Sequence, residues 1–220
     1  GVWIMAYTTI DNPELYFQCK NYSGNNSTNA ITFDGSEDMS PNMVWLKGRS
    51  GADNHRLYDT LRSTSSLVPN DNRAEQADGN FSSFNSDGFT ITGTDTGWNG
   101  SGETYVSWNW KETATAGFDI VAYTGTGSSN AVSHSLSATP NMIIIKNRDD
   151  SDSWYAWHQG LGAVASNYIN LDTSGAKSSV SDGITAISSS NFTVNTRGDV
   201  NASSEKYIAY CFADVKGYSK

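Results

Sequence analysis

Alternating polar and apolar positions mark short strands along this chain of 220 residues. The clearest stretch runs from Thr104 to Trp110, and the stretch from Lys206 to Phe212 repeats its pattern. A period of two is typical of a β-strand with one buried face. In both stretches we expect the more apolar set to face the core, namely Val106, Trp108 and Trp110 in the first and Ile208, Tyr210 and Phe212 in the second.

The chain also contains a long internal repeat. Pro41–Arg49 and Pro140–Arg148 share the pattern P-N-M, three apolar residues, K-x-R, and an offset of about one hundred residues also relates Asn99–Trp110 to Asn201–Phe212. A unit of this length is domain-sized and holds roughly seven strands. The continuously apolar runs inside the P-N-M segments suit strands that are covered on both faces.

The repeat predicts an all-β fold of two tandem homologous β-sandwich units, of jelly-roll or lectin-like type. The first unit is expected in residues 1–114, with a short N-terminal extension, and the second in residues 115–220. The matched strand faces predict that the two units superimpose.

Composition then argues against several function classes. The net charge is −9 and the 14 basic residues are scattered, whereas binding to a nucleic-acid backbone requires clustered Lys and Arg. No apolar stretch approaches the ~20 residues that span a bilayer, so neither membrane insertion nor a nucleic-acid partner is expected.

The usual sequence signatures of hydrolases, zinc enzymes and nucleotide enzymes are missing. His55, His134 and His158 show no ligand-like spacing. We therefore expect no enzyme activity, no catalytic residue, no metal site and no cofactor. Cys19 shares a face with Phe17 and is predicted to lie in the core, and the repeat gives no reason for it to pair with Cys211.

Four aromatic residues are candidates for ligand binding: Trp98, Trp154, Tyr155 and Trp157. Their counterparts in the other copy differ in size, since Val200 corresponds to Trp98 and the stretch 55–58 to 154–157. Residues that only packed a shared core should keep their bulk at equivalent places. We therefore predict that Trp98 and at least one of the other three are partly exposed and contact a sugar or another subunit, with core packing as the alternative.

Several segments together resemble a family of uncharacterised, repeat-containing proteins of marine and environmental bacteriophages. The segments that carry the resemblance are Met5–Gln18, Pro41–Arg49, Ser83–Phe89, Asn99–Trp110 and the closing Tyr207–Lys220. The resemblance covers nearly the whole chain, carries no catalytic residues, and implies a virion or tail-fibre protein. In that pattern Met5 is the natural start, and Gly1–Ile4 are left unexplained.

The leading hypothesis is therefore a structural protein of the phage virion, either a tail fibre or an appendage on the particle surface. Its expected partners are further copies of itself, other virion proteins and host surface glycans. A soluble lectin-like carbohydrate-binding module is the alternative, and a polysaccharide depolymerase is a third hypothesis.

Overall fold

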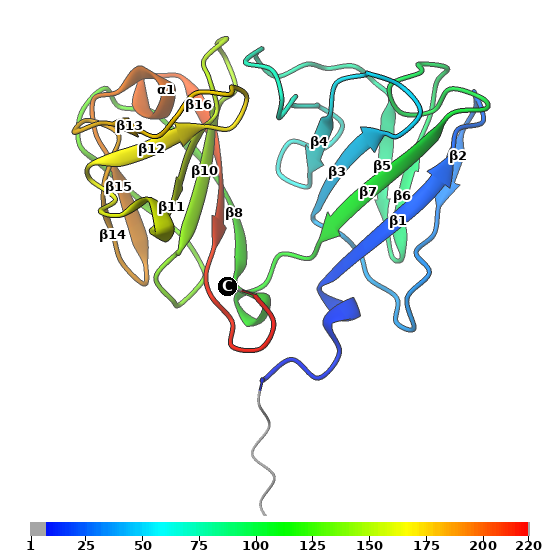
Figure 1. The fold of residues 1–220 in the computed structure, drawn as a ribbon, viewed down its shortest axis with the longest axis horizontal. Coiled ribbons are helices and arrows are strands. Elements are labelled where there is room, and N and C mark those ends of the chain that lie inside the picture. The colour runs from blue at the N-terminus through cyan, green and yellow to red at the C-terminus, as the bar shows by residue number, and fades with distance from the viewer. Residues whose placement is uncertain (1–7, 220) are drawn as a thin grey trace, which may run out of the picture.

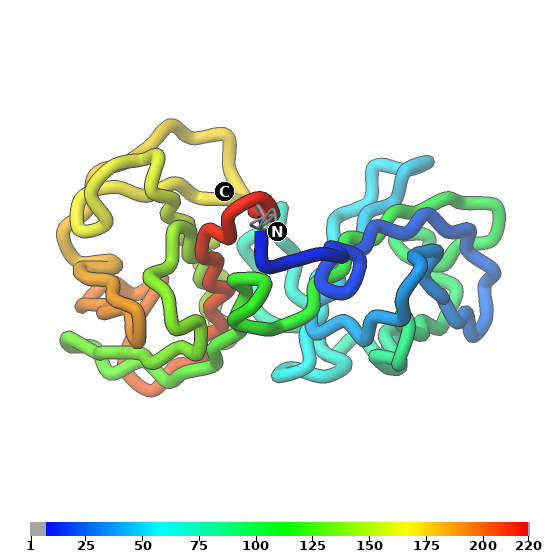
Figure 2. The backbone as a smooth tube through the Cα atoms, turned by 90° about the horizontal axis from the view of Figure 1, so that it is seen from below, coloured from blue at the N-terminus to red at the C-terminus, as the bar shows by residue number. Residues whose placement is uncertain are grey.

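A computed structural model describes residues 8–219 of the chain, so the expectation about Gly1–Ile4 lies outside the described residues. The fold is nearly all β, and its sheets are antiparallel. Two halves stand side by side and are joined by the segment between Trp110 and Phe118 (Figure 1). The tube in Figure 2 shows the two ends of the described chain close together near this junction.

Each half carries one large and one small sheet. The strands of the first half are β1 Phe17–Ser23, β2 Asn29–Ile31, β3 Met43–Gly48, β4 Arg56–Asp59, β5 Phe81–Asn85, β6 Gly88–Ile91 and β7 Thr104–Trp110. The strands of the second half are β8 Phe118–Thr124, β9 Asn130–Ser133, β10 Met142–Asn147, β11 Tyr155–His158, β12 Asn167–Asn170, β13 Ser178–Ser179, β14 Ile184–Ile187, β15 Asn191–Val194 and β16 Lys206–Phe212. Short helical turns complete the chain: η1 Pro13–Leu15, η2 Ala114–Ala116, η3 Gln159–Leu161 and α1 Gly198–Asn201.

The strand orders of the two halves correspond. The large sheet of the first half has the order β1-β7-β3-β4, and the second half contains the same arrangement as β8-β16-β10-β11, extended at one edge by β12 and β13. The small sheets correspond as β2-β6-β5 and β9-β15-β14. Pro41–Arg49 thus contains β3 and Pro140–Arg148 contains its counterpart β10. The expected boundary after residue 114 falls inside η2.

The registers agree as well as the orders. Met43 pairs with Trp110 in the first half, and Met142 pairs with Phe212 in the second. Each small sheet has its one register shift at the same place, between Phe81 and Ser83 and between residues 184 and 186. A shift of a strand by one residue would turn every side chain to the other face, so this agreement preserves the inward and outward sets of the repeat.

A hydrophobic core lies between the two sheets of each half. In the first half Val44, Leu46 and Tyr105 of the large sheet pack with Phe81 and Phe89 of the small one. The second half contains the equivalent cluster, with Ile143, Ile145, Tyr207, Ile184 and Phe192.

The predicted inward face of the last strand is wrong in both halves. Tyr105, Ser107 and Asn109 are the residues of β7 that are buried in the first half, while Val106, Trp108 and Trp110 are only half-buried. In β16 it is likewise Tyr207, Ala209 and Cys211 that join the core of their own half. Cys19, predicted to be a core residue, is exposed on β1.

The other faces of the large sheets pack against each other between the two halves. A third cluster joins Met43, Leu57 and Leu67 of the first half to Phe118, Ile120, Trp154, Ile208 and Tyr210 of the second. The apolar face of β16 is therefore buried against the neighbouring half instead of in its own core. β3 is covered on both faces, as its unbroken apolar run predicts, because Val44 faces one cluster and Met43 the other.

One buried asparagine in each half holds neighbouring loops together through hydrogen bonds. Asn99 and Asn201 are completely buried, and the side-chain amide of each donates to a main-chain carbonyl of an opposite loop, that of Ser27 at 2.6 Å and that of Ser128 at 2.5 Å. A buried polar group that is fully hydrogen-bonded fixes a loop without the cost of an unmade bond. The asparagine that begins each of the repeated segments Asn99–Trp110 and Asn201–Phe212 thus has a structural role.

Candidate functional site

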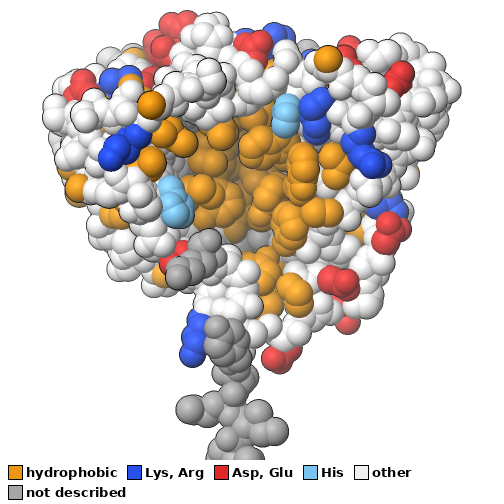
Figure 3. All heavy atoms as spheres, viewed as in Figure 1, with side chains coloured by type: hydrophobic (Ala, Val, Ile, Leu, Met, Phe, Trp, Pro, Cys, Tyr) orange, Lys and Arg blue, Asp and Glu red, His pale blue; other side chains and the backbone are white. Residues whose placement is uncertain are grey.

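A hollow opens between the two halves. Its walls come from the outer faces of the two large sheets and from the C-terminal loop, and its volume is about 330 Å³. Figure 3 shows apolar side chains gathered in this hollow on the face toward the viewer. Mostly apolar hollows of this size with a few polar groups at the margin are typical of binding sites.

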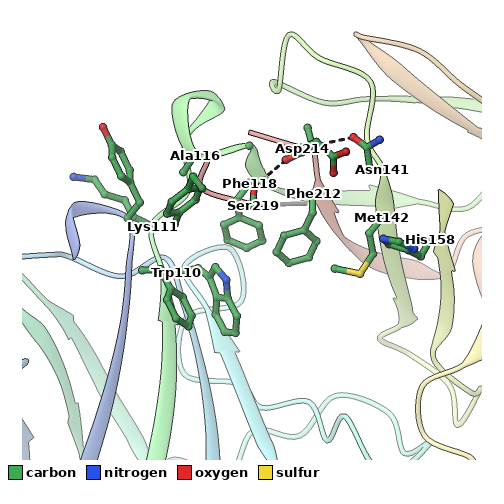
Figure 4. A pocket seen from close by; sticks show the side chains of 15 residues that line it. Trp110, Lys111, Ala116, Phe118, Asn141, Met142, His158, Phe212, Asp214 and Ser219 are labelled. Atoms are coloured by element: carbon green, nitrogen blue, oxygen red, sulfur yellow. Dashed lines mark hydrogen bonds between the residues drawn. The ribbon is translucent and has the colours of Figure 1, made fainter. Parts of the chain in front are cut away.

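Four aromatic rings form a row across the hollow. Phe17 and Trp110 come from the first half, and their centroids are 4.9 Å apart. Trp110 lies 6.5 Å from Phe118 of the second half, which stacks on Phe212 at 4.8 Å. Figure 4 shows Phe118 and Phe212 between Trp110 and Met142. The row is continuous across both halves, so its shape depends on how the halves are joined.

Polar groups border the rings on the second-half side. His158 and Asn141 stand beyond Met142 (Figure 4). The His158 Nδ1 atom accepts a hydrogen bond from the Gly160 amide at 3.0 Å. The Asn141 side chain is held by Gln159 at 2.8 Å and by the amide of Asp214 at 2.9 Å. Hydrogen bonds within the second half thus position both side chains.

A buried ion pair of the first half is hydrogen-bonded to the second half. The Arg62 and Asp59 side chains are fully buried, and their Nε and Oδ2 atoms are 2.7 Å apart. Tyr210 of the second half donates to the same Asp59 oxygen at 2.6 Å. Nearby, Arg148 of the second half binds Glu75 of the first through two hydrogen bonds of 2.6 and 3.0 Å. A bidentate Arg–carboxylate pair constrains geometry more strongly than a single contact.

Trp154 belongs to the same set of contacts between the halves and does not lie in an exposed loop. Its ring is fully buried between the halves, and its indole N–H donates to the carbonyl oxygens of Val68 at 3.0 Å and Asp71 at 3.2 Å. The ring also stacks on Tyr210. The predicted exposure is wrong for Trp154, although its contact partner does belong to the other copy of the repeat.

The predicted exposure is also wrong for the other three aromatic candidates. Trp98 is 3% exposed, Tyr155 0% and Trp157 4%. Trp98 packs in the first core, with the Arg56 guanidinium over its ring at 4.7 Å. Tyr155 and Trp157 pack in the second core. Cores tolerate large residues at non-equivalent positions when the total volume is conserved, so a difference in bulk between the copies did not indicate exposure.

A pair of carboxyl groups lies at the junction of the halves. Glu112 accepts a hydrogen bond from the Ile120 amide at 3.1 Å, and the neighbouring Asp119 accepts one from the Ser135 amide at 2.6 Å. Burial is the largest cause that raises the pKa of Glu112, and together with the adjacent carboxyl groups of Asp119 and Asp59 it brings the pKa to about 7, against the lowering effect of the Ile120 hydrogen bond. Glu112 is therefore partly protonated near neutral pH.

Sequence reasoning missed the ring row and this carboxyl pair. The pattern places Trp110 and Phe212 on strands, but it does not show that the face they share with Phe17 and Phe118 points out of each half. The signal that was available is the apolar character of both faces of β16, which a strand with one solvent face lacks. Across residues 8–219 no group of three or more His, Cys, Asp or Glu side chains is arranged to hold a metal ion, and no helix there is of a length and apolarity to cross a membrane.

These features define a β-rich protein whose two corresponding halves are locked together around an aromatic hollow. The chain belongs to the family described as a domain of unknown function, DUF7483, whose model matches residues 12–220. No curated protein and no solved structure matches the chain.

Proposed function

We propose that this chain is a non-enzymatic structural protein of a bacteriophage virion, a component of a tail fibre or surface appendage, built from two tandem β-sandwich units. The observation that carries the proposal is the agreement of the two halves in strand order and register, together with the buried contacts between them. Two units that buried contacts hold together suit a part of a particle that must keep its shape. The resemblance to phage proteins supplies the virion context.

Mass spectrometry of purified virions tests this role. The chain is expected in the particle in a fixed ratio to the other tail proteins, and antibody labelling in electron micrographs should place it on the particle surface. A particle that lacks the chain would overturn the proposal, whatever the protein does when isolated.

A second function, attachment to a host glycan, is favoured by the ring row. Half-buried rings offer a flat apolar face for the C–H groups of a sugar, and the margin with His158 and Asp214 supplies partners for its hydroxyls. The hollow replaces the four buried aromatic candidates as the place for such a ligand. We do not assign hydrolysis to it.

A glycan array, followed by titration of any hit, tests the second function. Trp110→Ala and Phe212→Ala should each weaken binding about tenfold or more, which corresponds to the loss of about 1.4 kcal/mol. Leu61→Ala is the matched control, because Leu61 is half-exposed and does not line the hollow. An array without hits removes this function, and release of reducing ends from a bound polysaccharide would instead support the depolymerase hypothesis.

A further inference from the structure

The two large sheets have corresponding edge strands, β1 in the first half and β8 in the second. An edge strand presents main-chain N–H and C=O groups that pair readily with another chain, and proteins usually protect it. The two edges are treated differently in this chain, although they share one register with their inner neighbours β7 and β16.

The β8 edge is covered by the segment that precedes it. Thr113 and Phe118 exchange two main-chain hydrogen bonds of 3.0 and 3.2 Å. The next outward N–H, that of Ile120, donates to the Glu112 carboxyl. The junction between the halves thus satisfies the outer edge of β8 over its first three residues.

The β1 edge lacks this cover. The Tyr16 carbonyl and the Gly24 amide belong to the ladder with β7, at 2.9 and 3.1 Å, so the residues of even number in β1 bond inward. The main-chain groups of Phe17, Cys19 and Asn21 consequently point outward. In the described chain no strand pairs with this side of β1.

From residue 8 onward, the segment before β1 makes no main-chain hydrogen bonds to β1 like those that Thr113 makes to β8. Asp11 and Asn12 stand where Glu112 and Thr113 stand in the second half. The Asn12 side chain accepts from the Glu14 amide and caps η1, and Asp11 is exposed. β1 itself has seven residues, contains no proline and pairs with β7 without a bulge. Of the common protective devices it carries one charged side chain, Lys20, which pairs with Asp34.

We propose that a second copy of this chain adds to the open edge of β1 in antiparallel fashion. The outward groups belong to odd-numbered residues, so odd residues must lie opposite odd residues. A register centred on Lys20 would place two ammonium groups directly opposite each other, which is destabilising. The register centred on Cys19 avoids this, because Lys20 then lies opposite Gln18 and Cys19 opposite Cys19 of the partner subunit.

A second copy fits this edge better than an unrelated strand because the pairing is self-complementary. Every copy brings the same open edge, and a twofold axis closes the contact without leaving a further free edge at the site. The two large sheets then form one sheet across the dimer, with 4 + 4 strands from the two first halves. This interface deepens the self-association expected of the proposed virion role but does not depend on the particle.

Sedimentation at several protein concentrations tests the pairing. The expected mass is that of a dimer, and the dimer should strengthen with salt because two copies of net charge −9 repel each other at long range. Cys19→Pro removes an outward N–H without touching the ladder to β7 and should weaken the dimer about tenfold or more. Cys19→Ser, which keeps the N–H, is the matched control and should leave the dimer unchanged.

Mild oxidation gives a second readout that does not depend on the proline variant folding. The wild-type chain should form a disulfide-linked dimer through Cys19, since Cys211 is fully buried, and Cys19→Ser should abolish the link. A chain that stays monomeric at all concentrations and forms no cross-link would overturn the interface. That result would leave the virion proposal standing, because the particle assay is independent of it.

Discussion

The connection that follows the fourth strand differs between the two halves, although β4 and β11 themselves correspond. In the second half it forms β12 and β13, which extend their own large sheet. In the first half it makes only single bridges, Leu57 to Leu67 and Ser66 to Gln76. The same segment sends Leu67 and Glu75 across to the second half.

The same place in the two halves thus makes two different contacts. The second half uses the connection to extend its own sheet, and the first half uses it to bind its neighbour. Tyr210 of the second half also donates to Asp59 of the buried ion pair with Arg62. The aromatic hollow lies between the halves that these contacts hold together.

The largest predicted effect on stability comes from Trp154, which lies in the contact between the two halves. Trp154→Ala removes a large buried ring and two hydrogen bonds, so it should lower the free energy of unfolding by about 4 kcal/mol in urea titrations. His55→Ala changes the corresponding position of the first half, where the side chain is half-buried, and should cost about 1 kcal/mol or less. Equal losses at the two positions would mean that the halves use this place in the same way.

Breaking the buried ion pair should have the next largest effect. Asp59→Asn removes the nearer counter-charge of the buried Arg62 guanidinium, leaving Glu75 at 3.8 Å, and should lower the free energy of unfolding by about 3 kcal/mol. Arg73→Ala breaks the more exposed pair with Asp71 in the same connection and should cost less than about 1 kcal/mol. Chemical denaturation of both variants checks the ranking. A smaller loss in the free energy of unfolding for Asp59→Asn than for Arg73→Ala would contradict the importance of the buried contact.

The junction between the halves should respond to pH. The pKa of Glu112 is raised from 4.5 to about 7, so the folded state binds its proton more tightly than the unfolded state. The associated stability is fully present below about pH 4.5 and is lost as the pH rises through 7. Glu112→Gln should remove this loss and, after allowance for the half-exposed carboxyl, gain about 1–2 kcal/mol over the wild type at pH 8.

Unfolding curves from pH 5 to pH 8 measure this difference. Glu37→Gln, on an exposed side chain, is the control and should leave the pH dependence of the wild type in place. Identical slopes for Glu112→Gln and the wild type would show that the carboxyl at the junction does not hold its proton.

The two cysteines should show the smallest effect on stability but a clear difference in reactivity. Cys19 is exposed and Cys211 is buried, and burial raises the pKa of the Cys211 thiol well above its usual range. Maleimide should modify Cys19 in the folded chain and Cys211 only after unfolding. Cys19→Ser should change the free energy of unfolding by less than about 0.5 kcal/mol. Rapid labelling of Cys211 in the native chain would place β16 at a surface.

The sequence was sufficient to predict the nearly all-β class, because turn residues and period-two strands are local features. The alternation in β7 was also correct, but its direction was not. Val106, Trp108 and Trp110 are apolar on the face that turns toward the hollow, whereas the core face carries the hydrogen-bonded Ser107 and Asn109. Periodicity identifies two faces and does not tell which neighbour covers each.

The binding candidates failed for a related reason. Trp98 lies in a Gly-rich loop, which suggested exposure, but the Tyr22 hydroxyl donates to its carbonyl at 3.0 Å and holds the loop against the core. Trp154 was recognised as different from its counterpart His55, yet the carbonyl groups that receive its N–H come from residues more than eighty positions away. Such long-range contacts leave no pattern in a single sequence.

Calorimetric unfolding of the whole chain tests the central claim most directly, which is that the two halves form one locked body. The account predicts a single transition whose calorimetric and van't Hoff enthalpies agree, because the shared cluster and the hydrogen bonds of Tyr210 and Arg148 couple the halves. Two separate transitions, each with the enthalpy of one half, would contradict it and would show that the hollow is not held at a fixed shape.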